Sequence, residues 1–557
     1  MKKKLLILAI LLIGAFFRFY DLNWDANQHL HPDERFLTMV GDSMKIPSSF
    51  MSYLSPQQSS MNPANIGYNF YVYGTFPVVA NKFLALATGN DNYNSFTLLG
   101  RMLSGFVDLL IVAMIFKTGE LFEKQYKLNK NVKYWAALFY AIAVLPIQLS
   151  HFFAVDTFVN AFVFLCFYFA LRFSFTKKWQ WLIISGIFLG LGIASKATAV
   201  FISPLLLYLI VNAYTEKKRV ARDDLIPLFG SLVLFAIVAY IAGRIADPYL
   251  FQTGNFFDPQ PSKLLIQNLK ELSAWSSPQA WYPPGVQWIH KTPILFALKN
   301  LVFFGIGIGY TLCFLLGTYF LFRKIRNGDL YVIFGWIVLF FLYQGFQTVQ
   351  TMRYFILLYP FLALFAGIGF AYIPKRVPRV LHGALLFIAV LWTLFFFSIY
   401  TKPVTRVTAS QWIYNNIPTH SILLTESWDD GLPLPIFDMS AKAYVPQQLP
   451  VFDPDTQQKW DKMNALLTQG NYLILSSNRG YGSIPTVPER FPKMKQFYQN
   501  LFAGKTAYKE IAQFTSYPSL TYLGIPLTIP DDAAEEAFTV YDHPKVIIFK
   551  NENNHSK

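Results

Sequence analysis

The sequence predicts a polytopic α-helical membrane protein with about eleven transmembrane helices, followed by a C-terminal exoplasmic domain of mixed α/β structure. Of its 557 residues, 54% are hydrophobic and 18% are aromatic, and only 14% are charged. A soluble protein of this size has about a quarter of its residues charged. Long apolar runs alternate with short basic patches up to about residue 400 and then stop. This alternation is typical of a membrane-spanning chain rather than of one large soluble core.

Each apolar run is long enough for a membrane helix that is tilted or partly buried by protein. We place the eleven spans at residues 5–20, 98–121, 134–149, 157–173, 179–194, 197–213, 225–245, 293–322, 330–346, 354–373 and 380–400. The first run follows three lysines, as a signal peptide would, but no small-residue cleavage site follows it. We therefore expect an uncleaved first span.

The connections between the runs predict the orientation. With the N-terminal lysines in the cytoplasm, five short basic connections share that side, at residues 124–133, 172–178, 217–222, 323–326 and 375–379. Cytoplasmic loops are enriched in Lys and Arg. The longer connections 21–97 and 247–292 and the tail 401–557 then face the exoplasmic side. Residues 1–400 would form the membrane module, and the function would lie on its exoplasmic face.

The aromatic-rich segment 68–87 is an alternative twelfth span. A twelfth span would move every later basic connection to the opposite side of the membrane, so we expect an interfacial helix there instead.

The tail changes character. Turn signals occur at residues 429–431 and 478–480, and β-type runs at 472–475 and 545–549, which predict a small mixed α/β domain. The only cysteines, Cys166 and Cys313, lie inside apolar runs and do not suggest a disulfide. The net charge of +15 does not indicate a nucleic-acid partner, because the basic residues lie between apolar runs and not along one helix face.

The densest set of titratable groups on the expected exoplasmic side is the stretch HLHPDERF, which contains His29, His31, Asp33 and Glu34. Adjacent carboxylates at a membrane surface repel each other and are partly desolvated, which raises a pKa and suits a general base. A solvated helix start, with Pro32 in the first turn, is the alternative. Alternating His29, His31 and Asp33 could also ligate a metal, but there is no matching downstream cluster.

Further charges are bounded by apolar sequence. Asp156 opens the fourth span, where it could be an ordinary helix N-cap. Arg101 begins the second span and could form a buried pair with Asp108, two turns further along. Lys196 and Arg353 have no acid nearby in the sequence, so a phosphate is a credible partner, although Arg353 could instead snorkel to lipid headgroups.

Together these residues resemble the GT-C glycosyltransferases, in particular the branch of protein O-mannosyltransferases and the aminoarabinose transferase that acts on lipid A. An acidic motif after the first helix, an arginine near the start of the second span, an Asp at the outer start of a later helix, a Lys turn and an Arg-Tyr opening occur in the same order. The matching segments are HPDERF, GRMLSGFVD, HFFAVDTF, GLGIASKATAV and MRYFILLYPFLALFAGIGF. They extend over most of residues 1–400.

The resemblance implies an inverting transfer of a sugar from a polyprenyl-phosphate donor to an acceptor hydroxyl on the exoplasmic face. Asp33 would take the acceptor proton, and Lys196 and Arg353 would stabilise the departing lipid phosphate. We therefore expect the following site: catalytic Asp33 and Glu34, with substrate binding by Asp156, Lys196, Arg353, Arg101 and His31.

The expected partners are the lipid-linked donor, a hydroxyl acceptor and the bilayer, with no nucleic acid. We predict no required cofactor and no metal, with a divalent metal left open. A lipid-linked-sugar flippase or secondary transporter is the alternative function, but the halves of the chain are not repeated and the carboxylates lie in a loop rather than within a span. A catalytically dead scaffold is a third. The sugar, the acceptor and the choice of undecaprenyl or dolichyl carrier stay open.

Overall fold

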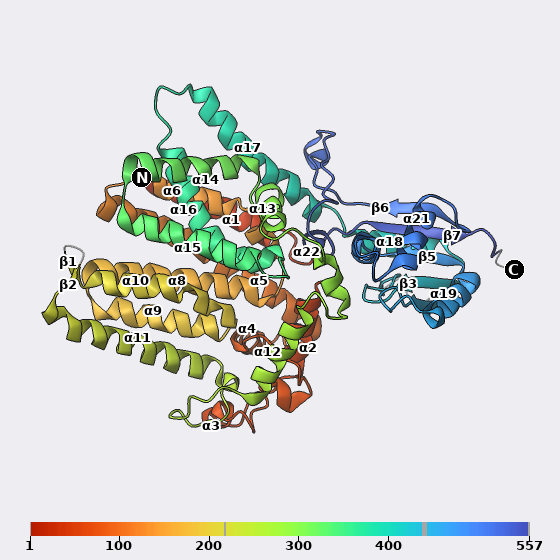
Figure 1. Cartoon of the computed structure of the whole chain (residues 1–557), viewed down its shortest axis with the longest axis horizontal. Coiled ribbons are helices and arrows are strands. Elements are labelled where there is room, and N and C mark those ends of the chain that lie inside the picture. Colours follow the sequence, from red (N-terminus) through yellow and green to blue (C-terminus); the bar gives the residue numbers. More distant parts are fainter. Residues whose placement is uncertain (1, 217–218, 437–442, 555–557) are drawn as a thin grey trace.

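The computed structural model describes residues 2–216, 219–436 and 443–554, so that residues 217 and 218 of the predicted basic connection 217–222 lie outside the described residues. Helices running roughly side by side form a bundle, and a sheet domain lies at one end of it (Figure 1). The bundle consists of α1 (Lys2–Phe19), α5 (Tyr93–Tyr126), α6 (Val132–Ala141), α7 (Val144–Ser150), α8 (Val155–Thr176), α9 (Trp179–Ile193), η2 (Ala197–Ile202), α10 (Ser203–Ala213), α11 (Leu225–Ala246), α13 (Leu295–Asn300), α14 (Ile308–Phe320), α15 (Gly328–Gly345), η8 (Met352–Leu358), α16 (Tyr359–Ala371) and α17 (Arg379–Phe397).

Every predicted span coincides with a helix or a pair of helices, which confirms the polytopic helical class. Among the described residues, seven helices are long and apolar enough to cross a membrane, or eight if the bent pair α6 and α7 counts as one. The other three predicted spans are α1, which carries charges at both ends, α9 and the run η2–α10. At about 1.5 Å per residue, the 15 residues of α9 fall short of a hydrocarbon core of about 30 Å.

The prediction of a single span over residues 293–322 is wrong. Helix α13 continues as a π-helical turn, Leu301–Gly305, and the chain then breaks before α14 starts at Ile308. Gly307 has a φ of +80°, a left-handed conformation that glycine adopts without a Cβ clash. The break is therefore built into the sequence at a glycine.

The bundle helices approach closely where glycines face a neighbour. A Cβ added at Gly369 of α16 would lie 1.9 Å from the carbonyl oxygen of Cys313 on α14, and one at Gly317 would lie 1.9 Å from that of Phe365. Small residues let membrane helices meet backbone to backbone. The contact between α14 and α16 thus depends on these two glycines.

Replacing Gly369 by Ala should destabilise the protein by about 1–3 kcal/mol, because the backbones must separate to make room for one methyl group. The thermal midpoint of the purified protein in detergent measures this. Gly383→Ala is the matched control on α17, where an added Cβ meets nothing within 4 Å, and its gain in helix propensity should leave it at least as stable as the native protein. Equal midpoints for the two variants would contradict the close approach.

The long connections and the tail lie at the same end of the bundle (Figure 1). The first connection forms α2 (Pro32–Ser43), α3 (Phe50–Leu54) and α4 (Phe76–Ala87), and the second forms α12 (Lys263–Trp275). Of the segment 68–87 that we considered as a twelfth span, only the 12 residues of α4 are helical. That helix is too short to span a membrane.

The tail forms the predicted mixed α/β domain. Its five-stranded sheet has the order β4 (Val445–Leu449), β3 (Ile422–Glu426), β5 (Tyr472–Leu475), β7 (Val546–Asn551) and β6 (Tyr508–Phe514). The first three strands are parallel, and β7 and β6 are antiparallel to their neighbours. The helices of the domain are α18 (Thr405–Asn416), α19 (Gln457–Gln469), α20 (Arg479–Ser483), α21 (Pro492–Phe502) and α22 (Glu536–Thr539).

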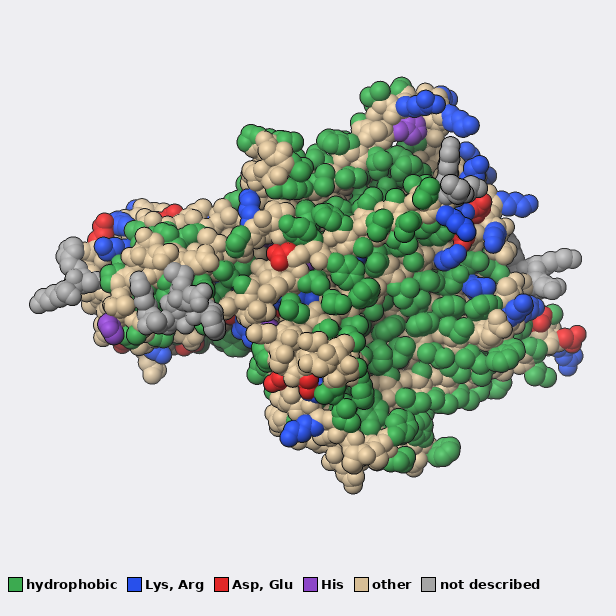
Figure 2. Space-filling model, turned by 180° about the vertical axis from the view of Figure 1, so that it is seen from behind, with side chains coloured by type: hydrophobic (Ala, Val, Ile, Leu, Met, Phe, Trp, Pro, Cys, Tyr) green, Lys and Arg blue, Asp and Glu red, His purple; other side chains and the backbone are tan. Residues whose placement is uncertain are grey.

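Figure 2 shows how hydrophobic and basic side chains are distributed over the surface. Hydrophobic side chains cover the flank of the bundle, and Lys and Arg gather at its end away from the sheet domain. A soluble protein rarely exposes so large an apolar area, so the flank is the surface that faces lipid. The chain is an integral multi-pass membrane protein.

Candidate functional site

Helix α2 carries the acidic motif at its first turn. His31 is the N-cap and accepts a hydrogen bond from the amide of Glu34 through Nδ1, at 3.3 Å. Pro32 suits the first helical position, and the acids that follow complement the positive end of the helix dipole. The helix start that we considered as the alternative is therefore present. Because consecutive helical residues point about 100° apart, Asp33 and Glu34 face different surroundings.

Glu34 faces the bundle and is fully buried. It accepts hydrogen bonds from Arg101, at 2.5 and 2.9 Å, and from the amide of Phe153, at 2.7 Å. Arg101 also binds both carboxylate oxygens of Asp25. Glu34 and Arg101 thus hold α2 against the bundle, and neither lines the open cavities described below. The alternative pairing of Arg101 with Asp108 is wrong, because Asp108 binds Arg18 at 2.6 Å.

Asp33 faces a different side of the helix and lines an open pocket. Its carboxylate accepts a hydrogen bond from Arg353 of η8, and both side chains are about one-fifth exposed. Beside them, Lys196 donates to Asp156 at the start of α8, at 2.7 Å, and lies 4.8 Å from the ring centre of Tyr354. Lys196 and Arg353 have no acid nearby in the sequence, but each has an acidic partner in the folded chain. Their partners are 40 and 320 residues away in the chain.

Two cavities meet at these ion pairs. One, of about 280 Å³, is lined by Asp33 together with Tyr282, Glu535 and Tyr541. The other, of about 510 Å³, is lined by Asp156 and by apolar side chains that include Phe201, Phe340 and Leu357. Lys196, Arg353 and Tyr354 line both. Both cavities have a mixed polar and apolar lining, and they adjoin at two cations.

Burial and neighbouring charges shift the pKa values of the titratable groups around the pocket. Burial alone would raise the pKa of Asp33, but Arg353 and His31 outweigh it and lower the pKa to about 2. Burial raises the pKa of Glu535 to about 7, against the hydrogen bonds that lower it. Burial also lowers the pKa of His31, which is packed between Phe152 and Tyr541. Asp33 is thus ionised at neutral pH, whereas Glu535 titrates near neutrality.

Glu535 and Tyr541 were not predicted from the sequence. Both come from the sheet domain, and Glu535 accepts a hydrogen bond from the amide of Met352, next to Arg353. The only local signal is the adjacent pair Glu535 and Glu536 in an otherwise ordinary segment. The pocket is therefore completed by a part of the chain that follows all the predicted spans.

The three residues that we considered as metal ligands contact different neighbours. The ring of His29 contacts Asn94 and Thr97, whereas His31 caps α2 and Asp33 binds Arg353. Within residues 2–216, 219–436 and 443–554, no group of three or more His, Cys, Asp or Glu side chains could hold a metal ion.

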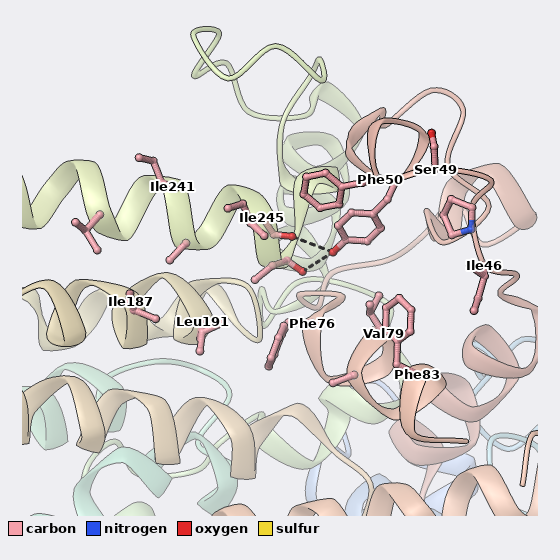
Figure 3. Close-up of a pocket in the computed structure, with 16 residues that line it drawn as sticks. Ile46, Ser49, Phe50, Phe76, Val79, Phe83, Ile187, Leu191, Ile241 and Ile245 are labelled. Atoms are coloured by element: carbon pink, nitrogen blue, oxygen red, sulfur yellow. Dashed lines mark hydrogen bonds between the residues drawn. The ribbon is translucent and has the colours of Figure 1, made fainter. Parts of the chain in front are cut away.

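A larger apolar groove of about 740 Å³ lies elsewhere, between α4, α9, α11 and the start of α3 (Figure 3). Its walls carry side chains such as Phe50, Val79, Leu191 and Ile241. The hydroxyl of Tyr53 is already bound to the carbonyls of Ile245 and Ala246, at 3.0 and 3.1 Å. The groove offers no acid, base or free cation among its lining residues.

One segment of the chain is similar to a known protein family. Residues 96–242 match the family model described as dolichyl-phosphate-mannose-protein mannosyltransferase, a segment that contains Arg101, Asp156 and Lys196. No curated protein sequence matches the chain.

Three solved structures are similar to this chain. The oligosaccharyltransferase of Archaeoglobus fulgidus, tethered to an acceptor peptide with the NVT sequon, is 11% identical with a TM-score of 0.51, covering 98% of this chain and 88% of that chain. Its apo form is 12% identical with a TM-score of 0.50, covering 94% and 75%. ArnT of Cupriavidus metallidurans bound to undecaprenyl phosphate is 12% identical with a TM-score of 0.48, covering 98% of each chain. At such low identities the first two show a shared fold.

Proposed function

We propose that the chain is a GT-C glycosyltransferase that transfers a sugar from a polyprenyl-phosphate donor to an acceptor hydroxyl, which its fold and the family model matched by residues 96–242 support. The observation that carries the proposal is the junction of the two cavities at Lys196 and Arg353. A lipid-linked sugar phosphate has an apolar tail, an anionic link and a polar sugar. The apolar wall of the larger cavity at Phe201, Phe340 and Leu357, the two cations, and the pocket at Asp33 provide for these parts in that order.

Binding of the donor exchanges partners at the ion pairs. The phosphate takes hydrogen bonds from Lys196 and Arg353, which in the free protein go to Asp156 and Asp33. Guanidinium and ammonium groups bind phosphate by charge-assisted hydrogen bonds. The carboxylate of Asp33 is then left facing the pocket with less of its charge neutralised, which makes it a stronger base.

The transfer is a single displacement. The acceptor oxygen attacks the anomeric carbon, the bond from that carbon to the phosphate oxygen breaks, and Asp33 takes the acceptor proton. The electron pair leaves on the lipid phosphate, whose charge Lys196 and Arg353 stabilise. One displacement inverts the anomeric configuration. Glu34 and Arg101 position α2, and Asp156 and His31 hold Lys196 and the start of α2 in place.

We place the pocket on the exoplasmic side. Basic side chains gather at the opposite end of the bundle, which is the arrangement that cytoplasmic loops adopt (Figure 2). The N-terminus and the short basic connections would then lie in the cytoplasm, with the sheet domain outside.

Replacing Lys196 by Ala should raise the KM for the polyprenyl-phosphate sugar and lower kcat, about tenfold or more in kcat/KM, because a charge-assisted hydrogen bond of about 1.5–3 kcal/mol is lost. Transfer rates and undecaprenyl phosphate binding in nanodiscs measure it. The exposed Lys299, near the sheet domain, is the matched control. Since the single variant leaves Asp156 buried and unpaired, the double variant Lys196→Ala with Asp156→Asn should show the same loss of donor binding. Unchanged binding of undecaprenyl phosphate in both variants would show that Lys196 does not bind the donor phosphate.

The pH profile should separate the free enzyme from its donor complex. In the free enzyme Arg353 holds the pKa of Asp33 at about 2. When the phosphate draws Arg353 away, that pKa rises. Because the carboxylate form is active, the rate falls as pH drops through the pKa, so the acid limb of kcat should lie at higher pH than that of kcat/KM. Coincident limbs would contradict the exchange of partners. A limb near pH 7 that disappears in Glu535→Gln belongs to Glu535 instead.

A further inference from the structure

We propose that a third cavity, between α2 and the sheet domain, is a subsite that binds a carbohydrate, so that the acceptor is a glycan or a glycolipid headgroup. The cavity measures about 260 Å³ and is lined by residues that include Arg35, Arg406, Trp428, Asp430, Arg479 and Tyr541. The inference rests on the sugar transfer proposed above and names the acceptor class for it.

The cavity adjoins the reactive pocket. Tyr541 lines both, and Pro32, which lines the third cavity, immediately precedes Asp33 on α2. Arg35, two residues after Asp33, reaches across to Asp430 of the sheet domain at 2.9 Å. A ligand held in this cavity therefore lies beside the reactive pocket, with Tyr541 between the two.

Aromatic rings connect the two cavities. Trp428 is 54% exposed, and its ring meets that of Tyr282 edge-on at 6.0 Å. Tyr282 in turn stacks on Trp275 at 5.2 Å, and both of these rings line the pocket at Asp33. The electron-rich face of an aromatic ring attracts the C–H face of a sugar ring, which is apolar and slightly positive. The exposed ring of Trp428 therefore suits a sugar unit held in the third cavity.

The polar groups of the cavity match hydroxyls rather than ions. Arg406 binds Asp429 at 2.7 Å and Asp430 at 3.0 Å, and Arg479 binds Glu536 at 2.7 Å. With each guanidinium already facing a carboxylate, the site has little net charge to offer an anion. Carboxylates accept several hydrogen bonds and guanidinium groups donate several, so the network can still serve hydroxyls, which do both.

The backbone at Trp428 is strained. Its φ of +69° is left-handed, which is costly for a bulky side chain, and its carbonyl is held by Arg479. A large apolar ring kept exposed at the mouth of a polar cavity, in a costly conformation, favours a stacking role over a role in the core. The cavity is also smaller than the sites of about 300–1,000 Å³ that hold drug-sized ligands, which favours a single sugar unit over a folded peptide segment.

The test uses the full chain in nanodiscs with three probes: a panel of neutral mono- and disaccharides, a Ser/Thr-containing peptide and undecaprenyl phosphate. We expect at least one saccharide to bind the native protein, by tryptophan fluorescence or saturation-transfer NMR, and Trp428→Ala to weaken that binding at least tenfold. Trp428→Phe, which keeps a stacking face, should restore most of it. Trp281→Ala is the matched control, since Trp281 is 47% exposed but lines neither cavity.

The outcomes separate this proposal from the proposed function. Undecaprenyl phosphate should bind Trp428→Ala as tightly as the native protein, and the thermal midpoint should stay the same. If donor binding persists but no saccharide binds, or saccharide binding is equal in Trp428→Ala and Trp281→Ala, the carbohydrate subsite is wrong and the transfer remains. Binding of the Ser/Thr peptide in place of saccharides, lost in Trp428→Ala, would also overturn it. Failure of undecaprenyl phosphate to bind any form would instead refute the proposed function.

Discussion

Replacing Asp33 by Asn should reduce sugar transfer by about 10²–10⁴-fold, because the amide cannot accept the proton of the acceptor hydroxyl. Donor binding should be kept or tightened, because Arg353 no longer donates a hydrogen bond to a carboxylate. The loss therefore falls on kcat. Single-turnover transfer from a polyprenyl-phosphate sugar in nanodiscs, together with undecaprenyl phosphate binding, measures the two effects separately.

Asp42→Asn is the matched control, because Asp42 lies on the same helix with its side chain exposed. Its transfer rate should equal that of the native protein. Glu535→Gln is the competing test, since Glu535 lines the same pocket and its pKa of about 7 suits proton transfer near neutrality. If Glu535→Gln abolishes transfer and Asp33→Asn does not, the base is Glu535 and our assignment of Asp33 is incorrect.

Replacing Arg101 by Ala should destabilise the protein by about 3–5 kcal/mol, because Asp25 and Glu34 are left buried without their common partner. Activity should fall as well. Glu34 lies between Asp33 and Arg35 on α2, so a shift of this helix also moves the reactive carboxylate of Asp33. The thermal midpoint in detergent and the yield of folded protein measure the loss.

Two further variants test whether the loss of stability comes from the buried ion pairs. Lys117→Ala removes an exposed pair with Glu120, which should change stability by less than about 1 kcal/mol. The triple variant Arg101→Met, Asp25→Asn, Glu34→Gln removes the charges together, and it should recover much of the stability because neutral groups are cheaper to bury than unpaired ions. An Arg101→Ala protein as stable as Lys117→Ala would show that the buried network does not hold α2.

The membrane spans could be predicted from the sequence because hydrophobicity is a local property of each run. Their internal breaks could not, as residues 293–322 show, where the helix ends at Gly305 and a new one starts after Gly307 in the middle of an apolar run. The candidate residues of the motif HPDERF could also be found, since charges next to apolar runs are conspicuous.

Their partners could not be predicted in the same way. Asp33 meets Arg353 across 320 residues, so no local pattern joins them, and Lys196 seemed unpaired because Asp156 lies on another helix. Adjacent Asp33 and Glu34 looked like one pair of acids, yet the turn of the helix points one to an open pocket and the other into the bundle. Glu535 carries no signal of its own, because only the docking of the sheet domain brings it to the site.

Three successive residues of α2 engage three different bodies: Asp33 the pocket, Glu34 the bundle through Arg101, and Arg35 the sheet domain through Asp430. Inserting or deleting one residue before them would rotate all three by about 100° at once. Point substitutions here can be compensated one at a time, but a change in length cannot. This short stretch should therefore tolerate no insertions or deletions over evolution, even where its side chains vary.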